Sequence, residues 1–465
     1  MLRAAESRSR TEQVMAAVRR KIAGRRLGQG ARLPSIRALA GTMGVSTSTV
    51  VEAYERLAAE GLIRARPGAG FFVAGPPAPL ALAELGPKLD RAIDPFWVSR
   101  QALDAGVAML KPGCGWLPPD WLPEAALRRA LRGQARAESA DLGEYAVPLG
   151  LAALRQHLAR RLAQHGIEAA PGQILLTESG TGAIDLVCRF LLEPGDAVLV
   201  DDPCYFNFLA LLRAHRARVV GVPMTPTGPD LARFAQAIEA HRPRLYLTNS
   251  AIHNPTGASL SPVVAHRLLT LADAGGLTVV EDDIFGDLAT GPVTRLAAFD
   301  GLRRVVHVGS FSKTLSAALR CGFIAARPDW IEGLVDLKLA TSFSGGRLAE
   351  GVVLRLLLDG SYRRHLGGLH ARLARARDLT LRRLAELGIE PWLEPSAGMF
   401  LWCRLPDGLD AAAVARRALE EDVVLAPGNV FSIGQTAGGF LRFNVAQCAE
   451  PQAFAVLAGA MRAAG

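Results

Sequence analysis

Apolar residues near the start of the chain recur at helical spacing. Within residues 11–22 they fall on one face, at Val14, Ala17, Val18 and Ile22, which predicts an amphipathic helix. Beyond residue 90, short apolar runs of strand length alternate instead with longer helical stretches. The pattern therefore predicts a small helical module followed by a larger α/β body.

Two short helices are predicted directly after the first one, joined by a tight turn at Gly44-Val45. Ser35 and Ser46 each precede an apolar segment, and a serine oxygen there can accept from helix N–H groups that have no other partner. Two short helices joined by so brief a glycine-containing turn indicate a helix-turn-helix. The second helix would bury a stripe formed by Val50, Tyr54 and Leu57.

Residues 64–73 (RARPGAGFFV) predict two short strands around Pro-Gly-Ala-Gly, the wing of a winged helix. In this arrangement the first turn of the second helix enters the major groove, and nearby arginines grip guanine or phosphate. The alternative is that these serines and threonines only cap the helix and the arginines are solvated. The side chains predicted to contact DNA are Ser35, Arg37, Ser46, Thr47, Ser48, Thr49, Arg64 and Arg66.

Strands alternating with helices indicate a mostly parallel, doubly wound sheet that binds ligands at the carboxyl ends of its strands. From about residue 330 the pattern becomes helical and ends in strands at 400–404 and 440–445, which predicts a smaller α+β subdomain. We divide the chain into residues 1–75, a proline- and alanine-rich linker at 76–90, and residues 91–465. Strands of the large sheet are predicted at 174–177, 197–200, 218–222, 245–248, 278–281 and 305–308.

Composition adds a charge asymmetry to this organisation. The chain has 465 residues and a net charge of +9, and residues 1–75 hold 13 Lys or Arg against 5 Asp or Glu. A positive field confined to one small domain indicates a polyanionic partner, for which we favour DNA over membrane because no basic amphipathic helix has aromatic anchors. No signal peptide or apolar membrane span is evident, so we expect a cytoplasmic protein.

The six cysteines are scattered without Cys-x-x-Cys spacing, which argues against a zinc site and a disulfide framework. We expect buried free thiols and no metal site.

The strongest chemical signal is Lys313, which follows the serine-rich turn Gly-Ser-Phe-Ser. After it comes a segment with helical periodicity that carries Arg320. Serines and an arginine there would bind a phosphate, and an amine beside a phosphate-anchored aldehyde forms a Schiff base. This predicts pyridoxal 5'-phosphate (PLP), although a lone lysine in a turn is usually a solvated surface group.

Other candidate partners of PLP lie at the ends of other predicted strands. Gly180 and Thr181 begin a helix and would bind an anion, as helix N-termini do. Tyr205 could stack on a planar ring, Asn254 could donate to a phenolic oxygen, and Asp282 could keep a ring nitrogen protonated. Each of these residues, taken alone, has an ordinary structural explanation. Their order along the chain, with each at the end of its own strand, has none.

The amino-terminal segment LPSIRALAGTMGVSTSTVVEAYERLAAEG matches the pattern LPSxRxLAxxxGVSxxTVxxAYxxLxxEG. It thereby resembles the winged helix of GntR-type bacterial regulators. That family often has arginine where this chain has Thr47, so the operator sequence does not carry over.

From about Tyr145 onward the chain resembles fold-type I, aspartate-aminotransferase-like enzymes, whose mostly parallel sheet is seven-stranded. The resemblance implies that Lys313 is the catalytic Schiff-base lysine and that Arg442, in FLRFNV, clamps a substrate carboxylate. Tyr145 would reach the phosphate of the neighbouring subunit, which implies a homodimer. Phe285 replaces a common tyrosine and lacks its hydroxyl, which weakens the case for efficient transamination. The cofactor-binding set is Lys313, Asp282, Asn254, Tyr205, Gly180, Thr181, Ser310, Ser312, Arg320, Tyr145 and Phe285.

The whole order, winged helix, linker and aminotransferase-like domain, resembles the MocR subfamily of GntR-type regulators. The resemblance implies a PLP-dependent transcription regulator that binds a double-stranded DNA operator and senses an amino compound, or PLP itself, through an aldimine at Lys313. A working aminotransferase with a secondary DNA-binding domain is one alternative. A degenerate domain that only dimerises is another.

Overall fold

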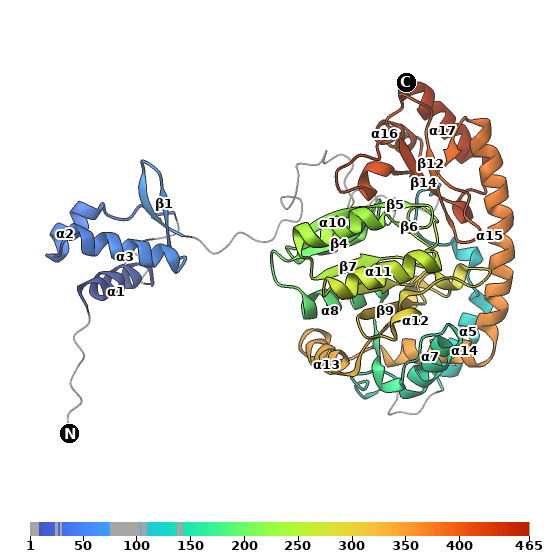
Figure 1. Ribbon diagram of the computed structural model, residues 1–465, viewed down its shortest axis with the longest axis horizontal. Coiled ribbons are helices and arrows are strands. Elements are labelled where there is room, and N and C mark those ends of the chain that lie inside the picture. Colours follow the sequence, from blue (N-terminus) through green and yellow to red (C-terminus); the bar gives the residue numbers. More distant parts are fainter. Residues whose placement is uncertain are drawn as a thin grey trace. The chain divides into compact units, whose positions relative to one another are not determined.

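The computed structural model describes residues 9–23, 27, 30–74, 103, 109–136 and 143–464. The chain forms two compact units, Met1–Ala81 and Leu82–Gly465 (Figure 1). The predicted linker at 76–90 lies outside the described residues.

The small unit is a three-helix module with a two-stranded wing, so the predicted winged helix-turn-helix is confirmed. Ser35 and Ser46 cap α2 and α3 by accepting from the N–H groups of Ala38 and Thr49. Tyr54 is fully buried in the core and donates to the carbonyl of Pro34, which ties α3 to the start of α2. Its elements are α1 Arg10–Ala23, α2 Ile36–Met43, α3 Thr47–Ala59, β1 Ile63–Arg66 and β2 Gly70–Val73.

The large unit is built on an eight-stranded sheet in the order β3-β10-β9-β8-β7-β4-β5-β6. Adjacent strands from β9 through β5 pair in parallel, whereas β10 is antiparallel to both of its neighbours. The predicted mostly parallel α/β sheet is thus confirmed, and β6 adds only two residues to the seven longer strands. The strands are β3 Ile174–Thr177, β4 Ala197–Asp202, β5 Arg218–Thr225, β6 Gly228–Pro229, β7 Leu245–Thr248, β8 Thr278–Asp282, β9 Val305–Ser310 and β10 Gly322–Ala325.

Helices cover both faces of this sheet because alternate side chains of its buried strands point in opposite directions. Val279 packs in the cluster that includes residues of α7, α10, α11 and α14, whereas Val280 packs in the cluster with α8, α9 and α13. These helices are α7 Ala152–Gln164, α8 Gly180–Leu191, α9 Phe206–Ala214, α10 Leu231–His241, α11 Pro262–Ala274, α13 Pro328–Ser342 and α14 Arg347–Leu358; α5 Glu124–Gln134 and α12 Leu296–Asp300 complete this part.

The sequence prediction of a helix after Lys313 was wrong. Within residues 311–321 the chain forms one 3₁₀ turn, Ala317–Leu319, and Arg320 adopts a left-handed conformation with φ 47°. The chain must turn back here because the next segment, β10, fills the space between β9 and β3. The need to complete the sheet outweighs the local helical pattern.

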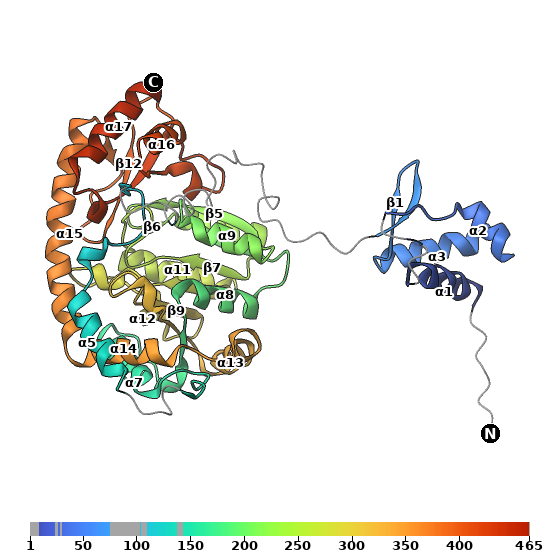
Figure 2. The same cartoon turned by 180° about the vertical axis from the view of Figure 1, so that it is seen from behind.

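The carboxyl-terminal part forms a second, four-stranded sheet in the order β11-β12-β14-β13, as the predicted α+β subdomain requires. Helix α15 runs along one side of the large unit, from this subdomain to the region of α5 and α14 (Figure 2). The elements are α15 Ser361–Glu386, β11 Glu390–Pro391, β12 Phe400–Arg404, α16 Ala411–Glu420, β13 Ala426–Pro427, β14 Phe440–Asn444 and α17 Pro451–Ala464.

All six cysteines are free and buried, as expected. None of the helices in the described ranges has the length and apolar content needed to cross a lipid bilayer.

The close packing around Gly322 gives a test of this fold. A β-carbon there would lie 2.7 Å from the carbonyl carbon of Ser179 and 3.0 Å from the nitrogen of Gly180. Backbone atoms cannot rotate away, so we expect Gly322→Ala to lower the free energy of unfolding by about 1–3 kcal/mol. Chemical denaturation measures the loss. Gly367→Ala, in α15 with nothing within 4 Å, is the control; equal stability of the two variants would contradict the packing described.

Candidate functional site

Lys313 lies just beyond the end of β9, at the carboxyl edge of the large sheet. Its Nζ donates to the carbonyl oxygen of Gly115 at 2.8 Å. Burial, reinforced by the charge of Arg442, lowers the pKa of Lys313 to about 8. A lysine with such a pKa is in part an uncharged nucleophile near neutral pH.

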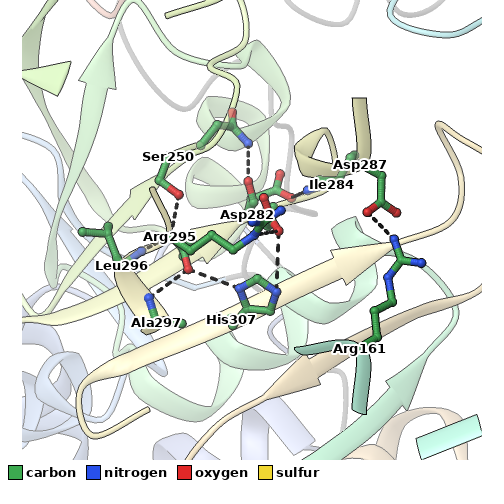
Figure 3. Close-up of polar contacts among 12 residues, drawn as sticks. Arg161, Ser250, Asp282, Ile284, Asp287, Arg295, Leu296, Ala297 and His307 are labelled. Carbon is green, nitrogen blue, oxygen red and sulfur yellow. Dashed lines mark hydrogen bonds and ion pairs between the residues drawn. The ribbon is translucent and has the colours of Figure 1, made fainter. Parts of the chain in front are cut away.

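Asp282 ends the neighbouring strand β8 and is 4% exposed. Its Oδ1 accepts from the N–H of Ile284 at 3.2 Å, and its own backbone carbonyl accepts from Asn249 (Figure 3). Burial raises the pKa of Asp282 to about 7. Among the described residues no cation forms an ion pair with this carboxylate, so a protonated ring nitrogen would supply the partner that it lacks.

Glu281 of β8 and His307 of β9 link these two strands by a buried contact. Glu281 is fully buried and accepts from Ser250 and from the N–H groups of Leu296 and Ala297, and His307 Nδ1 lies 3.2 Å from its Oε2. Burial opposes ionisation, but the hydrogen bond from His307 and the other donors holds the pKa of Glu281 below its usual value. The network anchors β8 to β9, and so Asp282 to the strand that leads to Lys313.

The predicted phosphate-binding residues gather where β3 and β9 flank β10. Gly322 of β10 pairs with both Thr177 and Ser310. Gly180 also lies close to Ser310, because a β-carbon added to Gly180 would be 3.5 Å from the β-carbon of Ser310. Ser310 Oγ donates to Ser312 Oγ at 3.0 Å. Together with the N-terminus of α8, these hydroxyls form a surface suited to an anion.

The remaining members of the phosphate set are exposed. Thr181 lies in the first turn of α8. Arg320 is exposed as well, and its positive charge contributes to lowering the pKa of Lys313.

Arg442 of β14 is 1% exposed, so its charge is buried and does not face solvent. Its two terminal nitrogens donate to Asn254 Oδ1 at 2.8 Å and to the carbonyl of Gly113 at 2.6 Å, and its guanidinium lies 4.5 Å from the ring centre of Phe400. Burial lowers the pKa of Arg442 to about 10. Its Nε and the Oδ1 of Asn249 have no hydrogen-bond partner.

The three predicted aromatic residues have different environments. Tyr205 packs against Phe206, with ring centres 5.0 Å apart, and lies close enough to Arg442 and Asp282 to interact with their charges. Phe285 is 3% exposed and meets Phe400 edge-on in the core of the carboxyl-terminal subdomain. Tyr145 is 78% exposed and is therefore not part of the buried site of its own chain.

Sequence reasoning missed the segment Gly113–Trp116, which closes the site from one side. Its carbonyl groups accept from Lys313, from Arg442 and from Asn444 Nδ2. Backbone carbonyls leave no residue-type signal, so the pattern could not have revealed them. Asn249 was also missed, although its position directly after β7 was a usable signal.

These residues fit PLP. A half-buried amine of lowered pKa and a buried carboxylate that forms no ion pair among the described residues are the two groups that a pyridine aldehyde would pair with.

In the small unit, the predicted DNA-contacting side chains lie on α2, α3 and the wing. Seven of them are exposed and Thr49 is partly buried. Ser46 Oγ lies 2.8 Å from the hydroxyls of both Ser48 and Thr49, so part of this hydroxyl cluster is engaged in capping. Arg66 stacks on Phe72, with 4.6 Å between its guanidinium and the ring centre. Arg37 and Arg64 carry exposed charges.

Residues 117–458 match the family model of aminotransferases class I and II, and residues 10–73 match bacterial regulatory proteins of the gntR family. The chain is 32% identical over 451 residues to an uncharacterized HTH-type transcriptional regulator, YdcR, of Escherichia coli, covering 94% of each. It is also 32% identical to a 2-aminoadipate transaminase of Thermus thermophilus, covering 71% of this chain and 84% of that one. The solved α-aminoadipate aminotransferase LysN of Thermus thermophilus, complexed with N-(5'-phosphopyridoxyl)-L-leucine, is similar with a TM-score of 0.72 at 28% identity, over 79% of this chain and 94% of that one.

The two shifted groups predict an unusual dependence of stability on pH for the protein without cofactor. Between pH 3.8 and about 7 the folded chain keeps a proton on Asp282 that the unfolded chain has lost, so the contribution of Asp282 to stability falls as pH rises, whereas the lowered pKa values of His157, His165 and His365 act in the opposite direction. Between about 8 and 10.5 the unfolded chain keeps a proton that folded Lys313 has lost, so the contribution of Lys313 rises, whereas the six buried thiols, whose pKa values burial raises, make stability fall. Each slope is at most about 1.4 kcal/mol per pH unit.

Urea denaturation from pH 5 to 10 measures this profile. Asp282→Asn should make the slope of stability against pH more positive between pH 5 and 7, and Lys313→Met should make it more negative above pH 8, while Asp336→Asn, at an exposed position of α13, serves as control. Acidic arms of equal slope in the wild type and Asp282→Asn would contradict the assignment.

Proposed function

Because the chain belongs to the class I and II aminotransferases and carries a gntR-family domain at its amino end, we propose that it is a PLP-dependent, DNA-binding transcription regulator. The observation that carries the proposal is the combination of Lys313 and Asp282 at neighbouring strand ends, with one pKa lowered to about 8 and the other raised to about 7. The similarity to the Escherichia coli regulator extends along 94% of both chains. We assign DNA binding to residues 1–75 and cofactor binding to residues 91–465.

Bound PLP would supply an aldehyde for an amine and a ring that withdraws electrons from the attached carbon. Lys313 provides the amine and, once displaced by an incoming amino compound, can hold or return a proton through its Nζ. Asp282 would hold a proton at the ring nitrogen, and Asn254 would donate to the phenolic oxygen. Ser310, Ser312, Gly180, Thr181 and Arg320 would bind the phosphate, and Tyr205 would stack on the ring.

Arg442 gives the site its selectivity for amino compounds that carry a carboxylate. The guanidinium already makes hydrogen bonds to Asn254 and Gly113, and its Nε is free to donate. A carboxylate entering this buried position gains a fixed, charged donor. The effector is therefore an amino acid or related compound, and it acts on DNA binding only to the extent that it prefers one of two arrangements of the protein.

A homodimer follows from Tyr145, which we propose reaches the phosphate of the partner subunit. Its ring lies 4.8 Å from that of Phe343, and both side chains are largely exposed in the single chain, at 78% and 56%. Exposed aromatic side chains grouped in this way are typical of interfaces.

Transamination is the second candidate function, and the complete set of Lys313, Asp282, Asn254 and Arg442 favours it. The transaminase of Thermus thermophilus is as similar in identity as the regulator. Phe285 argues against efficient turnover, because it leaves the phenolic oxygen of PLP with one donor fewer. Measured turnover of an amino acid with a 2-oxo acid would favour transamination as the function.

Covalent attachment tests the cofactor assignment. We expect PLP followed by borohydride to leave a pyridoxyl adduct on Lys313, seen by peptide mass spectrometry, and both Lys313→Ala and Lys313→Arg to reduce it to background. An adduct on the other buried lysine, Lys338, which donates to the carbonyls of Pro148 and Leu176, would refute the assignment.

Salt-dependent binding tests the DNA interface. We expect Arg64→Gln to weaken binding to duplex DNA from the region upstream of its gene and to lower the slope of log K against log salt by about 1. Arg19→Gln is the matched control, since Arg19 is paired with Glu60 at 2.5 Å. Equal affinities and slopes for the two variants would remove Arg64 from the interface.

A further inference from the structure

A second cavity of the large unit has no role in the function proposed above. It lies between α7, the segment after β8 and the start of α15, and its volume is ≈ 910 Å³. None of the residues assigned to PLP or to the substrate carboxylate lines it. Its walls carry four arginines from three separate segments: Arg160, Arg161, Arg295 and Arg363.

The one carboxylate in the lining, Asp287, is already engaged by two donors, of which Figure 3 shows Arg161. Arg161 donates to its Oδ1 and the hydroxyl of Tyr362 to its Oδ2. Burial opposes ionisation, but the charge of Arg161 holds the pKa of Asp287 below its usual value. Asp287 is thus ionised and offsets a single arginine.

Arg295 is likewise paired, through its Nε, with Asp283 Oδ2 at 2.7 Å, and it is 5% exposed. Arg160 and Arg363 have no ion pair among the described residues. The two acidic partners therefore balance two arginines and leave two positive charges facing the cavity. An unbalanced pair of guanidinium groups beside two fixed ones is a site for a doubly charged anion.

The other lining groups add donors and apolar surface without adding negative charge. His157, His165 and His370 face the cavity, and leucines of α14 and α15 form part of the wall. Burial, with nearby arginines contributing, lowers the pKa of His157 and lowers that of His165 to about 4, so both imidazoles are neutral near pH 7. The volume falls in the range of small-molecule sites and exceeds what a free phosphate ion needs.

We propose that this cavity binds a phosphorylated small molecule, with the phosphate held by Arg160, Arg161 and Arg363 and the organic part against the leucines. The protein then has two ligand sites, one for PLP and its amino compound at Lys313 and one for a phosphate ester near Asp287.

Titration calorimetry of the full-length protein with pyrophosphate and with inorganic phosphate tests the proposal. The protein is first treated with PLP and borohydride, so that the phosphate site near Lys313 is filled. We expect saturable binding of pyrophosphate that weakens at least tenfold in the double variant Arg160→Gln/Arg363→Gln. Both positions are exposed and form no ion pair within the described part of the chain, so the variant should fold.

Arg364→Gln is the control: it removes one positive charge, against two in the double variant, from the residue that follows Arg363 in α15, which donates to Asp359 and Ser361 and does not line the cavity. Absence of saturable binding to the wild type, or equal affinities of the double variant and Arg364→Gln, would overturn the proposal. Non-operator duplex DNA could also displace pyrophosphate from the wild type. That result would assign the cavity to nucleic acid and would overturn the proposal of a phosphorylated small molecule. If borohydride leaves no pyridoxyl adduct on Lys313, the function proposed for Lys313 fails. The same titration of untreated protein then still shows whether the cavity binds pyrophosphate.

Discussion

An amine and a carboxylate held out of water at neighbouring strand ends are the feature on which the site depends. Burial lowers the pKa of Lys313 and raises that of Asp282, so each is closer to its neutral form than it would be in water. Both shifts cost stability, because the unfolded chain can keep each group in its preferred charge state. A ligand that brings a protonated ring nitrogen to Asp282 and an aldehyde to Lys313 relieves both costs. The site is therefore selective for a ligand that carries both groups, because only such a ligand recovers the stability that burial costs.

The antiparallel strand β10 determines where the anion-binding part of the site lies. By pairing with β3 on one side and β9 on the other, it brings Ser310 next to the N-terminus of α8, although the two are 130 residues apart in sequence. Gly322 at this junction allows the backbone to approach Ser179 and Gly180 more closely than a β-carbon would permit. The turn at 311–321 follows from the same requirement, since the chain has to reverse within a few residues to start β10.

Arginines occupy three distinct environments in this protein. Arg442 is buried and held by fixed acceptors, which suits a carboxylate of defined orientation. Arg37, Arg64 and Arg66 are exposed on a unit that is strongly positive, which suits a long polyanion. The arginines around Asp287 are partly paired and surround a cavity, which suits a compact anion with an organic body. Burial and the number of neighbouring carboxylates, rather than residue type, distinguish these environments.

Much of this molecule was determined by local sequence. Apolar periodicity gave the winged helix and the strands of the large sheet, and caps such as Ser35 and Ser46 set where helices begin, because these effects act within a few residues. Only the tertiary structure decided the burial of Arg442, the carbonyl groups of Gly113–Trp116 around Lys313, the position of β10 and the cavity at Asp287. Each of these depends on segments far apart in the chain, and neither the solvation of a charge nor the direction of a carbonyl is encoded in the residues adjacent to it.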